Sequence, residues 1–195
     1  MQIKSAKFTI SVSNSDKLPC YGKPEIAIAG KSNVGKSSFI NFVCNNSKLA
    51  RTSSEPGRTR LLNYFEINGG EFYIVDMPGY GYARVSKDEK ACWGALAEGY
   101  LKNSKDIRCV VLLVDIRRDP DSDDRLLLSF MHAYGIPFAV IATKSDKLSR
   151  SQTFARRAEI AAGLNIGRDD VIAVSSLKKA GADEVLKLFE NSIHK

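Results

Sequence analysis

The loop GKSNVGKS at residues 30–37 is the stretch whose residue types and spacing most clearly suggest chemistry. It follows the apolar run EIAIA and precedes the apolar pair Phe39–Ile40, so we expect a strand before it and a helix after it. The pattern G-x-x-x-x-G-K-[ST] directs main-chain N–H groups at phosphate oxygens beside a helix N-terminus. Lys36 would reach the β- and γ-phosphates and the Ser37 hydroxyl would bind Mg²⁺, so the loop predicts a nucleotide site. A glycine-rich turn without a ligand is the alternative.

A second motif, DMPG, follows the apolar run FYIV and begins at Asp76. A carboxylate at the end of a strand can hold a metal-bound water, and the Gly79 N–H can meet a γ-phosphate. D-x-x-G alone is common in loops, but its position after a predicted buried strand strengthens the assignment. The nucleotide contacts predicted from these two motifs are Gly30, Lys31, Ser32, Asn33, Val34, Gly35, Lys36, Ser37, Ser38, Asp76, Met77, Pro78 and Gly79.

The motif ATKSD at residues 142–146 indicates which base is bound. The Asp146 carboxylate can accept hydrogen bonds from N1–H and the N2 amino group of guanine, whereas adenine has no matching donors. The Lys144 stem would lie along the base. Because the usual pattern is Asn-Lys-x-Asp, Thr143 is expected to lose an amide contact. With the VSSLKKAG loop, whose N–H groups would cover guanine O6, the predicted base contacts are Thr143, Lys144, Ser145, Asp146, Val174, Ser175 and Ser176.

The composition is that of one globular domain over residues 1–195, with residues 1–23 as an extension packed on it. Apolar residues make up 44% and charged residues 26% of the chain. No apolar run approaches the roughly 20 residues that span a bilayer, and the N-terminus does not read as a secretory signal. The cysteines are scattered, without a C-x-x-C pair or a nearby histidine, which disfavours zinc and favours thiols in a reducing cytoplasm.

The positive charge is concentrated in the first third of the chain. The net charge is +7, and residues 1–60 contain ten Lys/Arg and three acidic residues, so this segment alone carries +7. One interpretation is that a phosphate site and a solvated surface need some positive charge. The other is a basic face that meets a polyanion such as RNA. The sequence leaves both open.

Apolar, β-branched runs alternate with helix-like stretches along the chain. NGG at 68–70 predicts a tight hairpin and hence one antiparallel pair, and the polar stretch 47–60 predicts a long mobile loop. This alternation predicts a three-layer α/β domain with a mostly parallel sheet, which binds ligands at the carboxyl ends of its strands. The predicted strands are 25–30, 61–67, 71–77, 108–116, 137–144 and 170–176. The predicted helices are 37–46, 86–102 (with Ser86 and Glu89 as a capping box), 122–133, 152–164 and 182–193.

With these motifs placed, the chain resembles the EngB/YihA/YsxC family of small bacterial GTP-binding proteins, in the Era/TrmE-like group. The resemblance runs from PEIAIAGKSNVGKSSFIN through RTSSEPGRTR and DMPGYGYARVSK to ATKSDKLS. It implies a Ras-like P-loop NTPase fold with a six-stranded sheet, one antiparallel edge pair and an added N-terminal strand at about Lys7–Val12. It also implies Mg²⁺-dependent GTP binding and hydrolysis, a role in assembly of the large ribosomal subunit, and a requirement for normal cell division and septation.

The resemblance assigns further residues by position. Thr59 would close on Mg²⁺ when the γ-phosphate is present, with an ordinary loop threonine as the alternative. Asn33 matches an asparagine that coordinates K⁺ in some relatives, although it can equally brace the loop. The implied metal ligands are Ser37, Thr59 and, through water, Asp76. The additional nucleotide contacts are Gly57, Arg58, Thr59, Arg60 and Leu61.

Tyr80 occupies the position at which Ras-type GTPases have the glutamine that orients the attacking water. A phenol cannot take the same role and is expected to point away from the phosphates. We therefore expect slow intrinsic hydrolysis, with the missing group or the correct loop geometry supplied by a ribosomal partner. Arg58 and Arg60 could stabilise transition-state charge, or could face solvent or RNA. The rival functions are an ATP-using kinase, which Asp146 disfavours, and a division scaffold with little hydrolysis of its own.

Overall fold

The computed structural model describes residues 1–50, 61–80 and 87–194, without the side chains of residues 87–93. Most of the predicted 47–60 loop therefore lies outside the description, as do Ser86 and the Glu89 side chain of the predicted capping box. Within the described ranges, every helix is too short or too polar to be a candidate membrane span.

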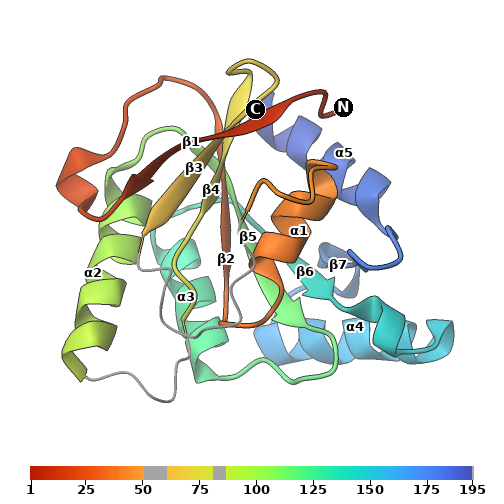
Figure 1. Ribbon diagram of the computed structural model, residues 1–195. Coiled ribbons are helices and arrows are strands. Elements are labelled where there is room, and N and C mark those ends of the chain that lie inside the picture. The colour runs from red at the N-terminus through yellow and green to blue at the C-terminus, as the bar shows by residue number, and fades with distance from the viewer. Residues whose placement is uncertain (51–60, 81–86, 195) are drawn as a thin grey trace.

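Seven strands of the described chain form one sheet (Figure 1). They are β1 (Ala6–Val12), β2 (Glu25–Gly30), β3 (Leu62–Ile67), β4 (Phe72–Asp76), β5 (Ile107–Asp115), β6 (Phe138–Thr143) and β7 (Val171–Ala173). Their spatial order is β1-β3-β4-β2-β5-β6-β7. β3 runs antiparallel to both neighbours, and the other adjacent pairs are parallel. The predictions of a mostly parallel sheet and an added N-terminal strand are confirmed. The predicted antiparallel hairpin is β3–β4, and it lies one strand in from the edge because β1 occupies the edge position.

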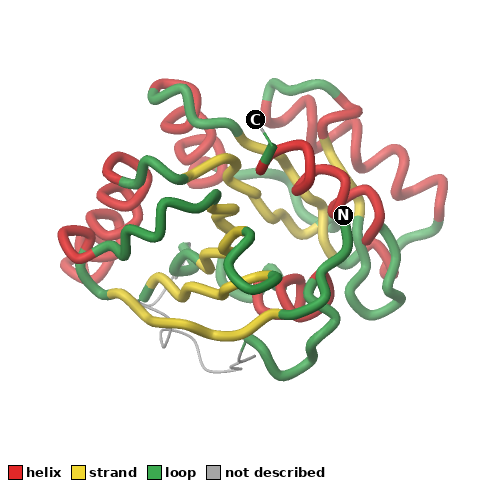
Figure 2. The backbone as a smooth tube through the Cα atoms, turned by 90° about the horizontal axis from the view of Figure 1, so that it is seen from above, coloured by secondary structure: helices red, strands yellow, loops and turns green. Residues whose placement is uncertain are grey.

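Helices cover both faces of this sheet. They are α1 (Lys36–Val43), α2 (Lys87–Asn103), α3 (Ser122–Ala133), α4 (Arg150–Leu164) and α5 (Ala182–Ile193). α1 and α5 pack on one face and α2, α3 and α4 on the other, and Figure 2 shows the strands running between them. In β5, Val110 and Leu112 face the α2–α4 side, while Val111 and Leu113 face α1 and α5. Burial on both faces explains the continuous apolar strands, and the three-layer prediction is confirmed.

Two elements, α1 and β7, end three residues before their predicted ends at 46 and 176. α1 ends at Val43, and Asn45 just beyond it adopts a left-handed conformation with φ 46° that stops the helix. β7 has three residues, because Ser175 leaves the sheet and pairs with Ala180 in an antiparallel bridge. This second difference moves the 174–176 segment out of the sheet and into a loop at its end.

The N-terminal segment contacts both the sheet and α2. β1 pairs with β3, and the ring of Tyr21 stacks on that of Tyr73 with 4.2 Å between centroids. The short 3-10 helix η1 (Ser15–Lys17) packs against α2 at Gly99, where a Cβ would lie 2.3 Å from the Ser15 hydroxyl oxygen. These contacts attach the segment to one edge of the domain.

Candidate functional site

The predicted motifs follow strands that end at the same edge of the sheet (Figure 1). β2 ends at Gly30, β4 at Asp76 and β6 at Thr143. The loop after β2 leads directly into α1, which begins at Lys36. Gly35 precedes this helix and provides no side-chain cap, so the N–H groups of the first turn point out of the helix end. Such an end favours an anion, because unpaired N–H groups and the helix dipole act together.

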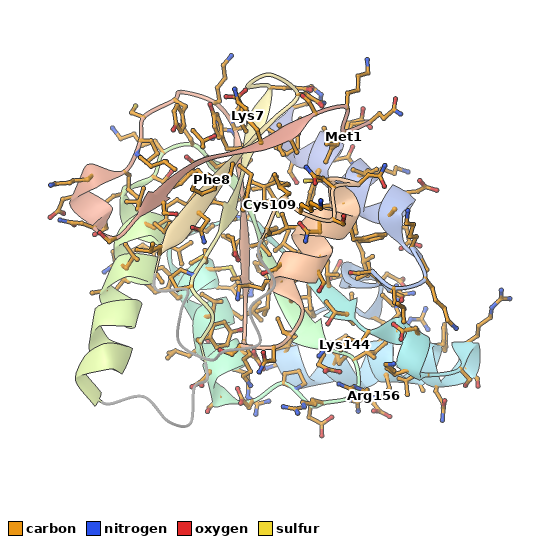
Figure 3. The ribbon with its side chains drawn as sticks, in the orientation of Figure 1. Met1, Lys7, Phe8, Cys109, Lys144 and Arg156 are labelled. Carbon is orange, nitrogen blue, oxygen red and sulfur yellow. The ribbon has the colours of Figure 1, made fainter. Side chains whose placement is uncertain are left out.

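Side chains after β6 tether this loop. The Thr143 hydroxyl, which is buried, lies 2.7 Å from the Val34 carbonyl oxygen and 3.1 Å from that of Val114. The Lys144 ammonium donates to the Asn33 carbonyl oxygen at 2.7 Å. Figure 3 labels Lys144 at the end of the molecule opposite Met1 and Lys7. Thr143 therefore supplies a contact of its own to the loop, although the sequence suggested only the loss of an amide.

Asp115, at the end of β5, is a residue that the motif analysis missed. Its carboxylate accepts from Lys144 Nζ at 3.0 Å and from Arg117 Nε and Nη2 at 2.9 and 2.7 Å. Burial alone would raise the pKa of this carboxyl, but the Arg117 and Lys144 hydrogen bonds lower it well below its usual 3.8. An acidic residue ending the apolar run VVLLV, as Asp76 ends FYIV, was the signal that could have identified it.

Replacing Asp115 with asparagine should weaken the tether and change the acid sensitivity of the fold. Because the folded-state pKa lies below 3.8, the carboxylate stabilises the protein above about pH 4, and this contribution disappears as the pH falls through the folded-state pKa. We expect D115N to lower the free energy of unfolding by about 2 kcal/mol near neutral pH, and by progressively less below about pH 4. Urea unfolding across this pH range measures the difference.

The matched control is D119N, because the Asp119 carboxylate is 84% exposed and its ion pair with Arg156 lies at the surface. Such pairs contribute about 1 kcal/mol or less. A destabilisation by D115N that stayed constant down to strongly acidic pH would contradict the assigned role of the carboxylate.

Asp76 combines deep burial with an unsatisfied oxygen. Its side chain is 4% exposed, and Oδ1 has no hydrogen-bond partner among the described residues. Burial raises the pKa of Asp76 to about 6, against the opposing effect of the Lys36 ammonium. A buried carboxylate oxygen without a partner suits a hard cation or its bound water, since Mg²⁺ prefers oxygen ligands. Together with the Ser37 hydroxyl in the first turn of α1, the residues present fit the Mg²⁺ that the sequence implied.

The DMPG segment lies directly against the phosphate loop. A Cβ added to Gly79 would lie 2.9 Å from Lys36 Nζ and 3.3 Å from the Ser32 main-chain nitrogen, so a larger side chain would displace these groups. The Ser32 N–H donates to the Tyr80 carbonyl oxygen at 3.0 Å. The structure thus brings two of the predicted motifs into contact, with the Gly79 backbone beside the lysine expected to hold phosphates.

Tyr80 itself is buried and directed at α3. Its side chain is 5% exposed, and its hydroxyl donates to Asp124 Oδ1 at 2.8 Å. Burial, reinforced by the neighbouring Asp124 carboxylate, raises the pKa of the phenol well above its usual value of 10.0, so it stays protonated. The tyrosine at the glutamine position is therefore engaged with the domain core.

The two predicted base-binding motifs meet beyond β6. Asp146 lies in the 3-10 helix η2 (Ser145–Lys147), and its Oδ1 accepts from the Ser175 hydroxyl at 2.7 Å. The Ser145 N–H donates to the Val174 carbonyl oxygen at 3.1 Å, which joins the segments directly. The Ser175 hydrogen bond lowers the pKa of Asp146, so the carboxylate is ionised and can accept hydrogen bonds from guanine.

The remaining predicted contacts divide between described and undescribed residues. Leu61 is half-buried just before β3, and Ser176 is half-buried in the loop after β7. The predicted contacts outside the described residues are Gly57, Arg58, Thr59 and Arg60.

Residues 25–144 match the family model described as 50S ribosome-binding GTPase. The chain is 46% identical over 187 residues to the probable GTP-binding protein EngB of Desulfosudis oleivorans, covering 96% of this chain and 94% of that protein. It is 44% identical over 195 residues to the protein of the same name from Caldanaerobacter subterraneus subsp. tengcongensis, covering 100% of both.

Two solved structures support the fold. One is a probable GTP-binding protein EngB, with a TM-score of 0.71, 23% identity, and coverage of 87% of this chain and 98% of that chain. The other is Era of Aquifex aeolicus bound to GDP and AlF4⁻, with a TM-score of 0.70, 23% identity, and coverage of 87% and 56%. Family model, relatives and fold agree with the motifs assembled at the strand ends, and the chain belongs to the EngB family of GTP-binding proteins, which are GTPases.

Proposed function

We propose that the protein is a cytoplasmic, Mg²⁺-dependent GTP switch that acts in assembly of the large ribosomal subunit and is required for normal division and septation. The observation that carries the proposal is the meeting of motifs at one sheet edge. Gly79 lies against Lys36 at one end of this site, and Asp146 is held by Ser175 at the other. The match to 50S ribosome-binding GTPases supports the choice of partner.

The chain's own residues would bind and orient the nucleotide. Main-chain N–H groups of residues 31–38 and the Lys36 ammonium would hold the phosphates. The Gly79 N–H would donate a hydrogen bond to the γ-phosphate and to no other phosphate group. The Asp146 carboxylate would accept hydrogen bonds from guanine. Ser37, Thr59 and, through water, Asp76 would hold Mg²⁺, which when bound neutralises charge on the phosphate oxygens.

Hydrolysis by the isolated protein should be slow. The Tyr80 hydroxyl is already committed to Asp124, so this side chain cannot orient water as a glutamine does. We propose that the ribosomal particle supplies the missing group or the productive geometry. GTP would add contacts to Thr59 and Gly79, and hydrolysis would remove them, so the nucleotide would control affinity for the particle.

The distribution of lysines supports a ribosomal RNA partner. Lys31 and Lys36 belong to the nucleotide loop, whereas Lys4, Lys7 and Lys17 are exposed elsewhere. Lys7 lies at the end of the molecule remote from Lys144 (Figure 3). Although Lys7 forms a surface ion pair with Glu66 at 3.0 Å, its side chain is still 69% exposed. Since these N-terminal lysines do not serve the phosphate site, they would be available to contact RNA phosphates.

A GTPase assay with and without purified large-subunit particles tests the proposal. We expect intrinsic turnover well below about 1 s⁻¹, as for unassisted Ras-type sites, and at least about tenfold stimulation by large but not small subunits. Fast turnover by the protein alone would contradict the assigned role of the particle. Parallel assays in potassium and in sodium test whether Asn33 holds K⁺, for which only a potassium-specific gain in rate would count.

The burial of Tyr80 also favours a second candidate, a nucleotide-binding scaffold in cell division with little hydrolysis of its own. Binding to large subunits, measured over a salt series with GDP and a non-hydrolysable GTP analogue, separates the two. A switch binds more tightly in one nucleotide state. Equal affinities without stimulated hydrolysis would favour the scaffold.

A further inference from the structure

A polar cluster whose centre, Tyr80 and Asp124, is buried joins the phosphate loop, the DMPGY segment and α3. Its members are Tyr80, Asp124, Lys31 and Asp121. Tyr80 is 5% exposed and Asp124 is 4% exposed. Such deep burial is unusual for a carboxylate. A charged group buried to this extent has to be fully hydrogen-bonded to be tolerated.

Both oxygens of Asp124 have partners. Oδ1 accepts from the Tyr80 hydroxyl at 2.8 Å, and Oδ2 accepts from Lys31 Nζ at 3.1 Å and from the Asp121 N–H at 3.0 Å. Lys31 also forms an ion pair with Asp121, which caps the N-terminus of α3. Asp124 therefore connects three segments that are far apart in the sequence.

The main chain beside this cluster is held at the same place. The Tyr80 carbonyl oxygen accepts from the Ser32 N–H at 3.0 Å, and residues Lys31 and Tyr80 form a parallel bridge. Gly79, the preceding residue, packs on Lys36. The Tyr80 side chain is held by Asp124 of α3, and the Tyr80 carbonyl group is held by Ser32 of the phosphate loop. The neighbouring Gly79 peptide therefore has little freedom to move.

We propose that Tyr80 and Asp124 are positioning residues that hold the Gly79 N–H where it meets a γ-phosphate, and so set the preference of the site for GTP over GDP. This inference rests on the proposed γ-phosphate contact of Gly79. Tyr80 therefore does more than replace the glutamine that orients water in Ras-type GTPases, because it positions Gly79. Because GDP has no γ-phosphate, loosening Gly79 weakens GTP binding selectively.

The test compares Y80F and D124N with the wild type by calorimetry, using GDP and a non-hydrolysable GTP analogue with Mg²⁺. We expect Y80F to lower affinity for the analogue about tenfold, corresponding to about 1.4 kcal/mol, and to change GDP affinity less than about twofold. If both residues act through one hydrogen bond, the double variant loses no more than the worse single variant.

Two matched controls isolate the effect. Y64F removes a buried hydroxyl that has no hydrogen-bond partner among the described residues, and D123N changes an exposed carboxylate on the same helix. Neither should alter the ratio of the two affinities. Equal losses for both nucleotides, an unchanged ratio or a gain in analogue affinity in Y80F would each overturn the inference. Failure of the wild type to prefer the analogue in Mg²⁺, or to bind either nucleotide, would instead refute the proposed γ-phosphate contact or the site itself.

Discussion

Replacing Asp146 with asparagine should lower affinity for GDP and GTP at least about a hundredfold, corresponding to about 3 kcal/mol. The carboxylate would accept from two guanine donors, N1–H and the N2 amino group, while the Ser175 hydroxyl holds Oδ1 in place at 2.7 Å. An asparagine amide would place its own NH₂ group against the amino group of guanine. The unpaired polar groups that result are costly in a site built for hydrogen bonding. Competition against a fluorescent guanine nucleotide measures the loss.

Xanthine nucleotides provide the positive control for this variant. Xanthine keeps N1–H but carries an oxygen in place of the amino group, so it matches an amide donor and acceptor. D146N should therefore bind xanthosine diphosphate more tightly than GDP, whereas the wild type should do the reverse. D169N, which changes an exposed carboxylate, should leave both affinities unchanged. If D146N bound both nucleotides as the wild type does, Asp146 would not be the base-reading residue.

Replacing Gly30 with alanine should lower the free energy of unfolding by about 4 kcal/mol, more than the other substitutions proposed for this protein. Gly30 has φ 153°, a backbone conformation that residues other than glycine rarely adopt. The backbone strain on an alanine at this position costs about 1–3 kcal/mol. Its Cβ would also lie 2.8 Å from the Leu113 carbonyl oxygen in β5 and 3.0 Å from a Val34 methyl group. Since the backbone of a central strand cannot move aside easily, overpacking adds a cost of similar size. Urea unfolding without nucleotide measures the sum.

The control variant is G135A, which separates strain from overpacking. Gly135 also has a positive φ, 63°, but a Cβ there would have no neighbour within 4 Å. G135A should therefore cost only about 1–2 kcal/mol, the penalty for the left-handed conformation. If both variants lowered the free energy of unfolding by similar amounts, the close contact of Gly30 with β5 would not be the reason that glycine is required there.

The fold was largely predictable, because it depends on patterns that are local in sequence. Continuous apolar runs indicate strands buried on both faces, and the helical stretches between them require parallel connections. β7 was predicted too long because VIAVSS reads as one run, whereas Ser175 pairs with Ala180 outside the sheet. That choice depends on a tertiary hydrogen bond that no local propensity reports.

The site was predictable where its chemistry is contiguous in the chain. The phosphate loop, Asp76 and Asp146 were each identified from a few neighbouring residues. Asp115 and Asp124 were missed because their partners lie far away: Lys144 is 29 residues from Asp115, and Tyr80 is 44 residues from Asp124. A carboxylate in the sequence does not indicate which distant cation or hydroxyl will reach it.

The sequence by itself indicated an α/β GTPase and the short motifs expected to bind phosphate and guanine, because strand patterns and motif chemistry depend on adjacent residues. Only the tertiary structure decided how those motifs are held together. The Thr143 hydroxyl reaches the Val34 carbonyl across 109 residues of chain, and Asp124 joins α3 to the residue that replaces a glutamine. Hydrogen bonds are short-range and directional, so their partners are set by which strand ends and helix termini become neighbours on folding.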